Sequence, residues 1–262
     1  MKNTQILIVA NQKGGTGKTS TTHNLGTALA RQGKKVLLLD LDPQSNLTMC
    51  MGYPNPDELP CTMANIIKEL IDETFTLSKE EYILKAEGCD LIPSSIQLSG
   101  IEPSLVNAMS RENILKNFLD RIKNDYDVIL IDTMPSLGML TINALVAATS
   151  VLIPVQAHYL SAKGLELLIS TIAKVKRNIN HELNFNGILI TMYNNRLNFS
   201  KSILQDLQSA YGEYIKIYNT TIPQSVKAVE NTAVGKSLFE YDPKCKVSIA
   251  YEEFAKEVIA NG

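Results

Sequence analysis

The chain has 262 residues, of which 45% are hydrophobic and 20% charged, a balance typical of one globular domain with a large core. Its formal net charge is −2 at pH 7, which excludes a global basic field that would attract nucleic acid, so any DNA binding would need a local patch. No apolar run reaches the roughly 18 residues of a membrane span.

The first predicted element is a strand that leads into a glycine-rich loop. The apolar run Ile6–Ala10 is followed by Asn11–Ser20, with the sequence NQKGGTGKTS, and then by a segment with helical periodicity. This order forms a phosphate cradle, because free backbone N–H groups and the helix dipole favour an anion. Lys18 is the cation expected at the β- and γ-phosphates, and the Thr19 hydroxyl is the expected Mg²⁺ ligand. A chance glycine-rich loop would not explain the flanking strand and helix.

The loop departs from the common phosphate-loop pattern and contains a second lysine. Gln12 occupies the place of the first glycine in G-x-x-x-x-G-K-[ST], and Lys13 stands at the start of the loop. This variant resembles the deviant Walker A signature K-G-G-x-G-K-[ST], whose family includes the ParA/Soj partition ATPases, MinD and the nitrogenase iron protein. The resemblance implies ATP and Mg²⁺ as cofactors. It also implies a set of nucleotide-binding residues, namely Lys13, Gly14, Gly15, Thr16, Gly17, Lys18, Thr19 and Ser20.

The second predicted strand ends in two carboxylates. The continuous apolar run Val36–Leu39 follows a helix expected to end near Gly33 and is typical of a strand covered on both faces. Asp40 and Asp42 come next, and residues two apart in an extended chain point to the same side. A solvated strand end is one interpretation. The D-x-D-P-Q sequence, however, resembles the family's second ATPase motif. That resemblance implies that Asp42 positions the attacking water and that Asp40 lies near the metal's outer shell.

Residues 53–110 carry little functional information. Tyr53–Asp57 is predicted as a loop, Met63–Ile71 and Ser78–Leu84 as helices, and Cys89–Ser94 as a strand. The surroundings of that strand resemble the family's IPSS-x-x-L region, in a part that contributes to dimer contacts in relatives. Nothing in the segment itself indicates what it contacts in this protein.

A further strand ends in a single carboxylate. Asn113–Ile122 has helical spacing, and Tyr126–Asp132 is an apolar strand closed by Asp132. This is the form of a Walker B strand, in which Asp132 would hold Mg²⁺ through a water. The alternative is an aspartate that caps the next helix. The family usually has Asp-x-Pro-Pro here; this chain has Met134 in the third position, which is not expected to disturb the carboxylate.

The alternation of elements predicts the fold. Val151–Val155 and Gly187–Thr191 are expected to be buried strands, with an amphipathic helix over Ser161–Lys176 between them. Strands alternating with helices of this length indicate βαβ units. We therefore predict an α/β protein in which residues 1–262 form a single doubly wound P-loop domain, with a mostly parallel twisted sheet flanked by helices.

The last third of the chain resembles the Soj type more specifically. In Thr191–Arg196, an arginine at the place of Arg196 contacts the DNA backbone in relatives. The turn around Pro223 resembles the Soj-type I-P-R-N-V-R sequence. This implies that Pro223 and Ser225 border the adenine and that Lys227 binds DNA, although Ser225 replaces the usual asparagine and Lys227 the usual arginine. For either cation alone, a solvated surface charge is the default interpretation.

Together the resemblances imply a ParA/Soj-type ATPase that partitions a plasmid or a chromosome. ATP would close a sandwich homodimer in which Lys13 of each protomer reaches the partner's phosphates, so that Lys13, Lys18 and Asp42 are the expected catalytic residues. The dimer would bind double-stranded DNA without sequence preference, and a ParB-like centromere-binding protein would stimulate a slow hydrolysis. We expect a cytoplasmic, nucleoid-associated protein. The first strand begins by about residue 5, so no N-terminal helix-turn-helix domain is expected.

Other classes fit the sequence less well. A MinD-like membrane-cycling ATPase needs a basic amphipathic C-terminal helix, whereas this chain ends with Glu252, Glu253 and Glu257 against Lys256. An iron–sulfur reductase needs cysteines after the Walker B strand, and Thr133–Leu145 contains none. The four cysteines have no metal-ligand spacing and are expected to be reduced thiols. A binding module with a decayed site would not retain both lysines and the carboxylates.

Overall fold

The computed structural model describes residues 4–157 and 162–260. The strands are β1 (Gln5–Val9), β2 (Val36–Leu41), β3 (Leu84–Ala86), β4 (Cys89–Ile92), β5 (Val128–Thr133), β6 (Ser150–Gln156), β7 (Asn184–Tyr193) and β8 (Ile217–Pro223). The α-helices are α1 (Lys18–Arg31), α2 (Asn46–Cys50), α3 (Met63–Ile71), α4 (Lys79–Tyr82), α5 (Leu98–Asn107), α6 (Ile114–Ile122), α7 (Met139–Ala147), α8 (Ala162–Asn178), α9 (Asn198–Tyr211), α10 (Lys227–Val234), α11 (Leu238–Tyr241) and α12 (Lys246–Ile259). Short 3-10 helices cover Pro56–Glu58, Arg111–Asn113 and Lys123–Asp125.

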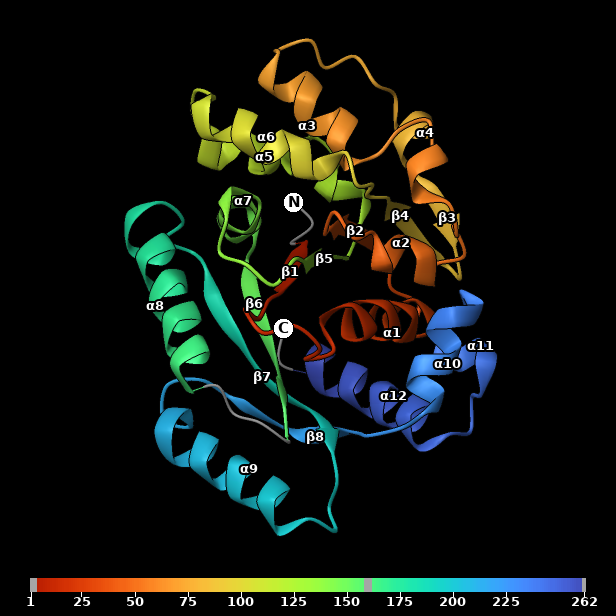
Figure 1. Ribbon diagram of the computed structural model, residues 1–262, viewed down its shortest axis with the longest axis vertical. Helices are drawn as coiled ribbons and strands as arrows, with labels where there is room; N and C mark the ends of the chain where they lie inside the picture. Colours follow the sequence, from red (N-terminus) through yellow and green to blue (C-terminus); the bar gives the residue numbers. More distant parts are fainter. Residues whose placement is uncertain (1–3, 158–161, 261–262) are drawn as a thin grey trace.

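The strands form one central sheet with helices on both faces (Figure 1). Its strand order is β3-β4-β2-β5-β1-β6-β7-β8, and the neighbouring strands are parallel except for the antiparallel pair β3–β4. This arrangement confirms the predicted α/β fold with a mostly parallel sheet. Because β1 lies between β5 and β6, the loop that follows β1 sits in the middle of the carboxyl edge, where such sheets bind ligands.

Two separate apolar cores hold the helices on the sheet. One core joins the sheet to α3 and α5–α9, and the other joins the opposite face to α1, α2, α11 and α12 (Figure 1). Helix α1 buries Leu25, Ala28 and Leu29 as expected, and it also packs against α12, where Thr21 Oγ1 and Tyr251 Oη are 3.2 Å apart. Because α1 is packed between the sheet and α12, it fixes the end of the phosphate loop that it adjoins.

The close approach of α1 to β2 depends on one glycine. A Cβ atom at Gly26 would lie 2.5 Å from a methyl carbon of Leu38. Only a residue without a side chain lets the helix pack this tightly on the strand that carries Asp40.

The structure corrects one predicted element. Ser78–Leu84 was expected to be a helix, but α4 covers only Lys79–Tyr82, and Leu84 begins β3. Leu84 pairs with Leu91 across a hairpin whose turn residues Glu87 and Gly88 have φ of 48° and 79°. Pairing with a partner strand overrides the helical pattern of the local sequence. The helix predicted over Met63–Ile71 is confirmed as α3.

Other boundaries differ slightly. The strand expected over Val151–Val155 is β6, the one over Gly187–Thr191 is the longer β7, and the helix expected from Ser161 is observed from Ala162. Ser161 itself lies outside the described residues. In the described part of the chain, no helix combines the length and the apolar character needed to cross a bilayer.

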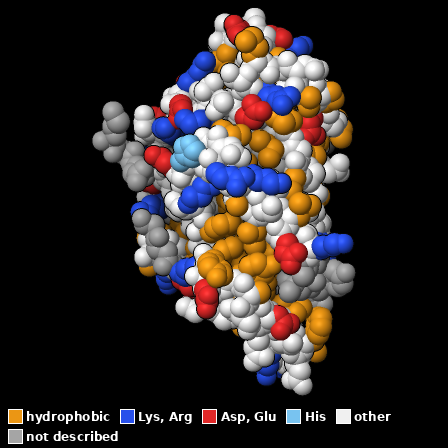
Figure 2. Space-filling model, turned by 90° about the vertical axis from the view of Figure 1, so that its left-hand side faces the viewer, with side chains coloured by type: hydrophobic (Ala, Val, Ile, Leu, Met, Phe, Trp, Pro, Cys, Tyr) orange, Lys and Arg blue, Asp and Glu red, His pale blue; other side chains and the backbone are white. Residues whose placement is uncertain are grey.

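The side of the molecule that carries α8 and α9 exposes apolar groups. Hydrophobic side chains gather there below a row of lysine and arginine side chains (Figure 2). Leu167 of α8 and Phe199 of α9 are each more than half exposed. This face lies away from α10–α12, on the far side of β7 and β8 (Figure 1).

Candidate nucleotide-binding site

The glycine-rich loop joins β1 to α1 and is shaped by positive φ angles. Gly15 has φ of 72° and Gly17 has φ of 83°, a left-handed conformation that side chains disfavour. Gly17 is also the N-cap of α1, so the backbone turns directly from the loop into the helix. Apart from the chain neighbours of each glycine, no heavy atom of the described residues lies within 4 Å of a Cβ built at Gly14 or Gly15, which leaves open space beside the loop.

Hydrogen bonds to neighbouring strands fix this loop in place. Asn11 Nδ2 donates to the Pro154 carbonyl of β6 at 2.8 Å, while Asn11 Oδ1 accepts the Lys13 N–H at 3.0 Å. On the other side, Thr191 Oγ1 of β7 donates to the Thr16 carbonyl at 2.8 Å. The sequence did not single out Asn11 or Thr191 as site residues, because their role depends on strands far away in the chain.

Lys18 begins α1 and is almost completely buried. Its Nζ donates to the carbonyl oxygen of Lys13 at 3.1 Å. Burial lowers the pKa of Lys18, and the nearby charges of Asp132 and Asp42 oppose that shift. A buried ammonium beside the helix N-terminus makes this pocket suitable for phosphate anions.

Asp132 and Asp40 stand side by side on β5 and β2. The two residues are register partners, and both are fully buried. Burial, reinforced by the Asp40 charge, raises the pKa of Asp132 to about 8, while Thr19 and Lys18 act in the opposite direction. Asp132 Oδ1 accepts from Thr22 Oγ1 at 3.5 Å, but among the residues that the structure describes Oδ2 has no hydrogen-bond partner. A buried carboxylate oxygen without a partner fits a divalent cation or its water.

The carboxylate of Asp40 is already engaged by the chain. Its Oδ2 accepts from the Thr48 N–H at 2.9 Å and the Thr48 hydroxyl at 2.7 Å, and its Oδ1 accepts from the Asp42 N–H at 3.1 Å. Burial raises the pKa of Asp40 to about 6 despite these bonds. Asp40 therefore fixes the turn that carries Asp42, whereas the oxygen available to a metal belongs to Asp132. Nothing in the local sequence indicated the contribution of Thr48.

Asp42 follows β2 at the same edge as the phosphate loop. Its Oδ1 accepts the Gln44 N–H at 2.9 Å, and its carbonyl accepts the Ser45 N–H at 2.9 Å. The side chain is buried next to Lys18, whose pKa it influences. The turn thus holds a second carboxylate near the phosphate cradle.

The two lysines of the loop have different partners. Lys13 Nζ donates to Gln156 Oε1 at the end of β6 at 3.2 Å, whereas Lys18 Nζ binds the loop backbone. Lys13 is half-buried, and Lys18 is buried. The loop therefore places one lysine inside the cradle and the other beside a neighbouring strand.

The remaining predicted residues follow β7 and β8 at this edge. Pro223 ends β8, and Ser225 Oγ accepts the Lys227 N–H at 3.2 Å. Arg196 is exposed in the loop between β7 and α9, where its N–H donates to Asn194 Oδ1 at 3.1 Å. Lys227 is exposed at the start of α10 and forms an ion pair with Asp242. Because β7 and β8 are parallel neighbours, the structure brings the two predicted DNA contacts to one edge.

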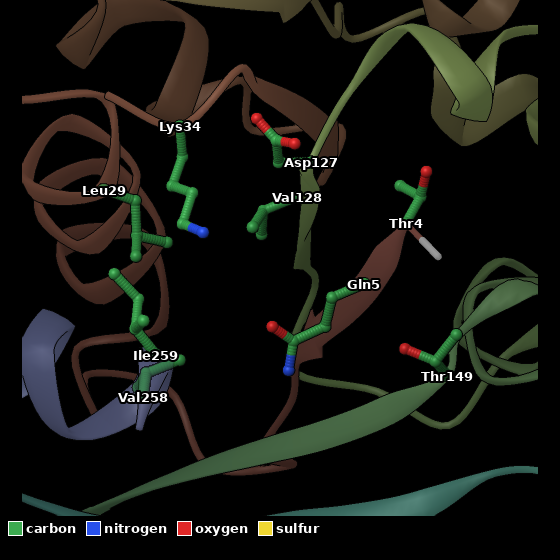
Figure 3. Close-up of a pocket in the computed structure, with 9 residues that line it drawn as sticks. All are labelled: Thr4, Gln5, Leu29, Lys34, Asp127, Val128, Thr149, Val258 and Ile259. Carbon is green, nitrogen blue, oxygen red and sulfur yellow. The ribbon is translucent and has the colours of Figure 1, made fainter. Parts of the chain in front are cut away.

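A cavity at the opposite, amino edge contains none of these residues. Its volume is about 330 Å³, and its polar side chains are Lys34, Gln5, Asp127, Thr4 and Thr149 (Figure 3). The walls also include Leu29, Val258 and apolar atoms of neighbouring residues. The predicted site residues therefore collect at the carboxyl edge alone.

The loop, the two lysines and the carboxylates at the ends of β2 and β5 define a P-loop nucleotide-binding domain with a deviant phosphate loop. A family model described as an AAA domain matches residues 4–185. The sporulation initiation inhibitor protein Soj of Bacillus subtilis is 41% identical over 98% of this chain and 99% of its own length. The chromosome-partitioning ATPase Soj of Treponema pallidum is 37% identical over 98% of this chain and 97% of its own. The chain belongs to the ParA/Soj family of partitioning ATPases.

A solved structure supports the same placement. A Mycobacterium smegmatis protein described as cobyrinic acid a,c-diamide synthase, with an ATP analogue and magnesium bound, superposes with a TM-score of 0.84. It is 35% identical to this chain and covers 98% of this chain and 95% of that one. The fold of the present protein is therefore one that holds a nucleotide and magnesium in a related protein.

Proposed function

We propose that this protein is a ParA/Soj-type ATPase that partitions plasmid or chromosomal DNA. ATP with Mg²⁺ closes a homodimer, the dimer binds double-stranded DNA without sequence preference, and a ParB-like centromere-binding protein stimulates a slow hydrolysis. The observation that carries the proposal is the pair of loop lysines with different partners, Lys18 inside the cradle and Lys13 beside Gln156.

The residues of the nucleotide site have separate roles in this proposal. The N–H groups of the loop from Gly14 to Ser20 and the ammonium of Lys18 bind the phosphates. Thr19 and Asp132 hold Mg²⁺, which supplies charge neutralisation at the phosphates when it is bound. Asp42 positions the attacking water, and Asp40 supports it through the turn described above.

Lys13 serves the partner protomer in this proposal. Lys18 already supplies a cation to the cradle of its own protomer, and the ammonium of Lys13 is held at the end of β6 by Gln156. A second cation that arrives only in the dimer would act as an arginine finger does, because it neutralises charge that develops in the transition state. Hydrolysis would then require dimerisation.

The surface residues complete the proposal. Pro223 and Ser225 border the adenine, and Arg196 and Lys227 contact DNA phosphates. A monomer would offer two such cations, whereas a dimer offers about four, so that DNA binding depends on ATP. The protein would act in the cytoplasm, associated with the nucleoid.

The MinD-like alternative has less support from the last helix. The apolar side chains Val247, Tyr251 and Phe254 of α12 are buried against α1 and β8. They therefore belong to the core and are not available to enter a lipid surface. The exposed positions of α12 include Glu252 and Glu253, which an anionic membrane would repel.

DNA binding tests the proposal directly. We expect mobility shifts on unrelated duplexes with ATP but not with ADP or without nucleotide. About four phosphate contacts give a log–log salt slope near −3.6, hence roughly 10²-fold weaker binding at 200 mM than at 50 mM salt. Arg196→Glu should abolish binding to every duplex alike while leaving ATP-dependent dimerisation unchanged.

Arg177 provides the matched control. It is an exposed arginine in the last turn of α8. That end of α8 lies at the amino edge of the sheet, whereas the loop that carries Arg196 lies at the carboxyl edge. Arg177→Glu makes the same change of charge and should leave the mobility shift intact. No shift with wild-type protein and ATP would contradict the proposed DNA binding.

A further inference from the structure

One of the two predicted DNA contacts is already occupied within the protein. The ammonium of Lys227, the first residue of α10, is hydrogen-bonded to Asp242 Oδ2 just after α11. This bond to the carboxylate raises the pKa of Lys227 and lowers the pKa of Asp242. A DNA phosphate that uses Lys227 must therefore compete with this carboxylate for the ammonium.

The backbone holds Asp242 in position to compete. Its N–H donates to the Leu238 carbonyl at 2.9 Å, and its carbonyl accepts from Ser248 Oγ at 2.6 Å and from the Cys245 N–H at 3.2 Å. These bonds fix the residue between α11 and α12. Because the backbone of Asp242 is fixed, its carboxylate stays near Lys227 even when the lysine side chain moves.

A second contact holds the two helices together. Tyr241 Oη donates to Glu230 Oε2 of α10 at 3.1 Å, and α10 and α11 lie side by side (Figure 1). Arg196 differs in this respect, since within residues 4–157 and 162–260 no carboxylate forms an ion pair with it. The two predicted cations of the DNA surface are therefore unequal.

We propose that Asp242 is an ionic latch that competes with DNA phosphate for Lys227 and so weakens the hold of the protein on DNA. The inference rests on the DNA binding proposed above. The latch lets the protein hold DNA through Arg196 and exchange the Lys227 contact between phosphate and Asp242. A surface that must release DNA after hydrolysis benefits from such an internal competitor.

The size of the effect follows from the strength of exposed ion pairs. Such pairs change an equilibrium by about 1.5-fold to 5-fold, so two latches in a dimer would weaken DNA binding by about 2-fold to 25-fold. Salt screens the pair, so the effect should be largest at low salt and shrink as salt is added. Removing the latch should therefore steepen the salt dependence of DNA binding.

The test measures the affinity of the full chain with ATP for a labelled duplex of arbitrary sequence by fluorescence anisotropy. Asp242→Asn keeps the backbone bonds and the side-chain size and should tighten binding by about 2-fold to 25-fold at low salt. Asp242→Ser should do the same, which guards against a specific effect of asparagine. Nucleotide binding by each variant checks that it is folded.

The matched control lies on α11. Glu240 pairs with Lys236 at 2.6 Å. Glu240→Gln removes one negative charge, as Asp242→Asn does, but leaves the Lys227–Asp242 pair in place. We expect it to leave the affinity and its salt dependence unchanged. The double variant Lys227→Gln with Asp242→Asn should bind no better than Lys227→Gln alone, because the latch has nothing left to release.

Four outcomes would overturn the latch. Equal tightening by Glu240→Gln and Asp242→Asn would assign the effect to overall charge. Tightening by Asp242→Asn in the Lys227→Gln background would assign it to direct repulsion between Asp242 and DNA. Unchanged affinity in both Asp242 variants would show that the pair does not compete. If neither wild type nor any variant binds the duplex with ATP, the proposed DNA binding fails and the latch with it.

Discussion

The charged groups at the phosphate loop and the two predicted DNA contacts, on the β7–α9 loop and at the start of α10, are held in opposite ways. Lys18, Asp40 and Asp132 are buried, and one carboxylate oxygen of Asp132 has no hydrogen-bond partner in the described part of the chain. Arg196 and Lys227 are exposed, and Lys227 is paired with Asp242. Burying charge costs several kcal/mol per ion, whereas an exposed pair is worth at most about 1 kcal/mol. Substitutions in the first region should therefore abolish nucleotide binding or hydrolysis, whereas breaking the exposed pair in the second should change DNA affinity only several-fold.

The largest effect should come from Lys18. Lys18→Ala removes the buried ammonium that donates to the loop backbone, so ATP binding should fall below detection in isothermal titration calorimetry. Asp42→Ala is the contrasting variant. It should still bind ATP but lose hydrolysis, because the attacking water is no longer positioned. Normal ATP affinity in the Lys18→Ala protein would show that the cradle does not depend on this cation.

Lys13 should show a smaller and more selective effect. Lys13→Ala should keep monomeric ATP binding, because Lys18 and the loop remain, yet lose the ATP-dependent dimer. Its hydrolysis should fall by about 10³-fold to 10⁵-fold, the range for a charge supplied in trans. Size-exclusion chromatography with ATP and a phosphate-release assay measure both properties.

Mixing variants tests whether Lys13 acts across the dimer. A Lys13→Ala protomer has an intact cradle, and a Lys18→Ala protomer still carries Lys13. Their mixture should therefore recover part of the activity that neither protein has alone. Full activity of the Lys13→Ala protein by itself would contradict the action of Lys13 in trans.

The two regions also differ in how far the sequence could predict them. The phosphate loop depends on local conformation, because Gly15 and Gly17 need positive φ and the strand and helix adjoin them. The fold could be predicted for a similar reason, since apolar strands and amphipathic helices alternate along the chain. The roles assigned to Lys18, Asp42 and Asp132 stay predictions, but the structure brings the three residues together.

Contacts between distant segments could not be predicted. The pair Lys227–Asp242 forms because α10 and α11 pack side by side, and the bond from Thr48 to Asp40 forms because α2 packs back against β2. The β3–β4 hairpin was missed because Leu84 pairs with a strand that the helical pattern of residues 78–84 does not reveal. In each case, the partner is chosen by tertiary packing and has no fixed spacing in sequence.

The smallest effect concerns a histidine–glutamate contact that is remote from the phosphates. His23 Nε2 of α1 lies 3.7 Å from Glu87 Oε2 in the β3–β4 turn, and Glu87 Oε1 accepts the Ser237 N–H at 2.6 Å. Burial would raise the pKa of Glu87, but the His23 ring and the Ser237 N–H outweigh it and lower that pKa to about 2. The Ser237 N–H and the His23 ring lie against this carboxylate, which is remote from the phosphate loop, so its removal should affect stability and leave ATP binding intact.

The sign of the pH dependence follows from the lowered pKa of Glu87. The folded value of about 2 lies below the ordinary value of 4.5, so the stabilisation is complete above about pH 4.5 and is lost as the pH falls toward 2. For a half-buried group screened by solvent, we expect about 1–2 kcal/mol. Urea unfolding between pH 7 and pH 3 should therefore show a smaller loss of stability for Glu87→Gln than for wild type. Glu252→Gln, at an exposed position of α12, should follow the wild-type curve. If Glu87→Gln also follows that curve, the His23–Glu87 contact contributes nothing to the pH dependence of stability.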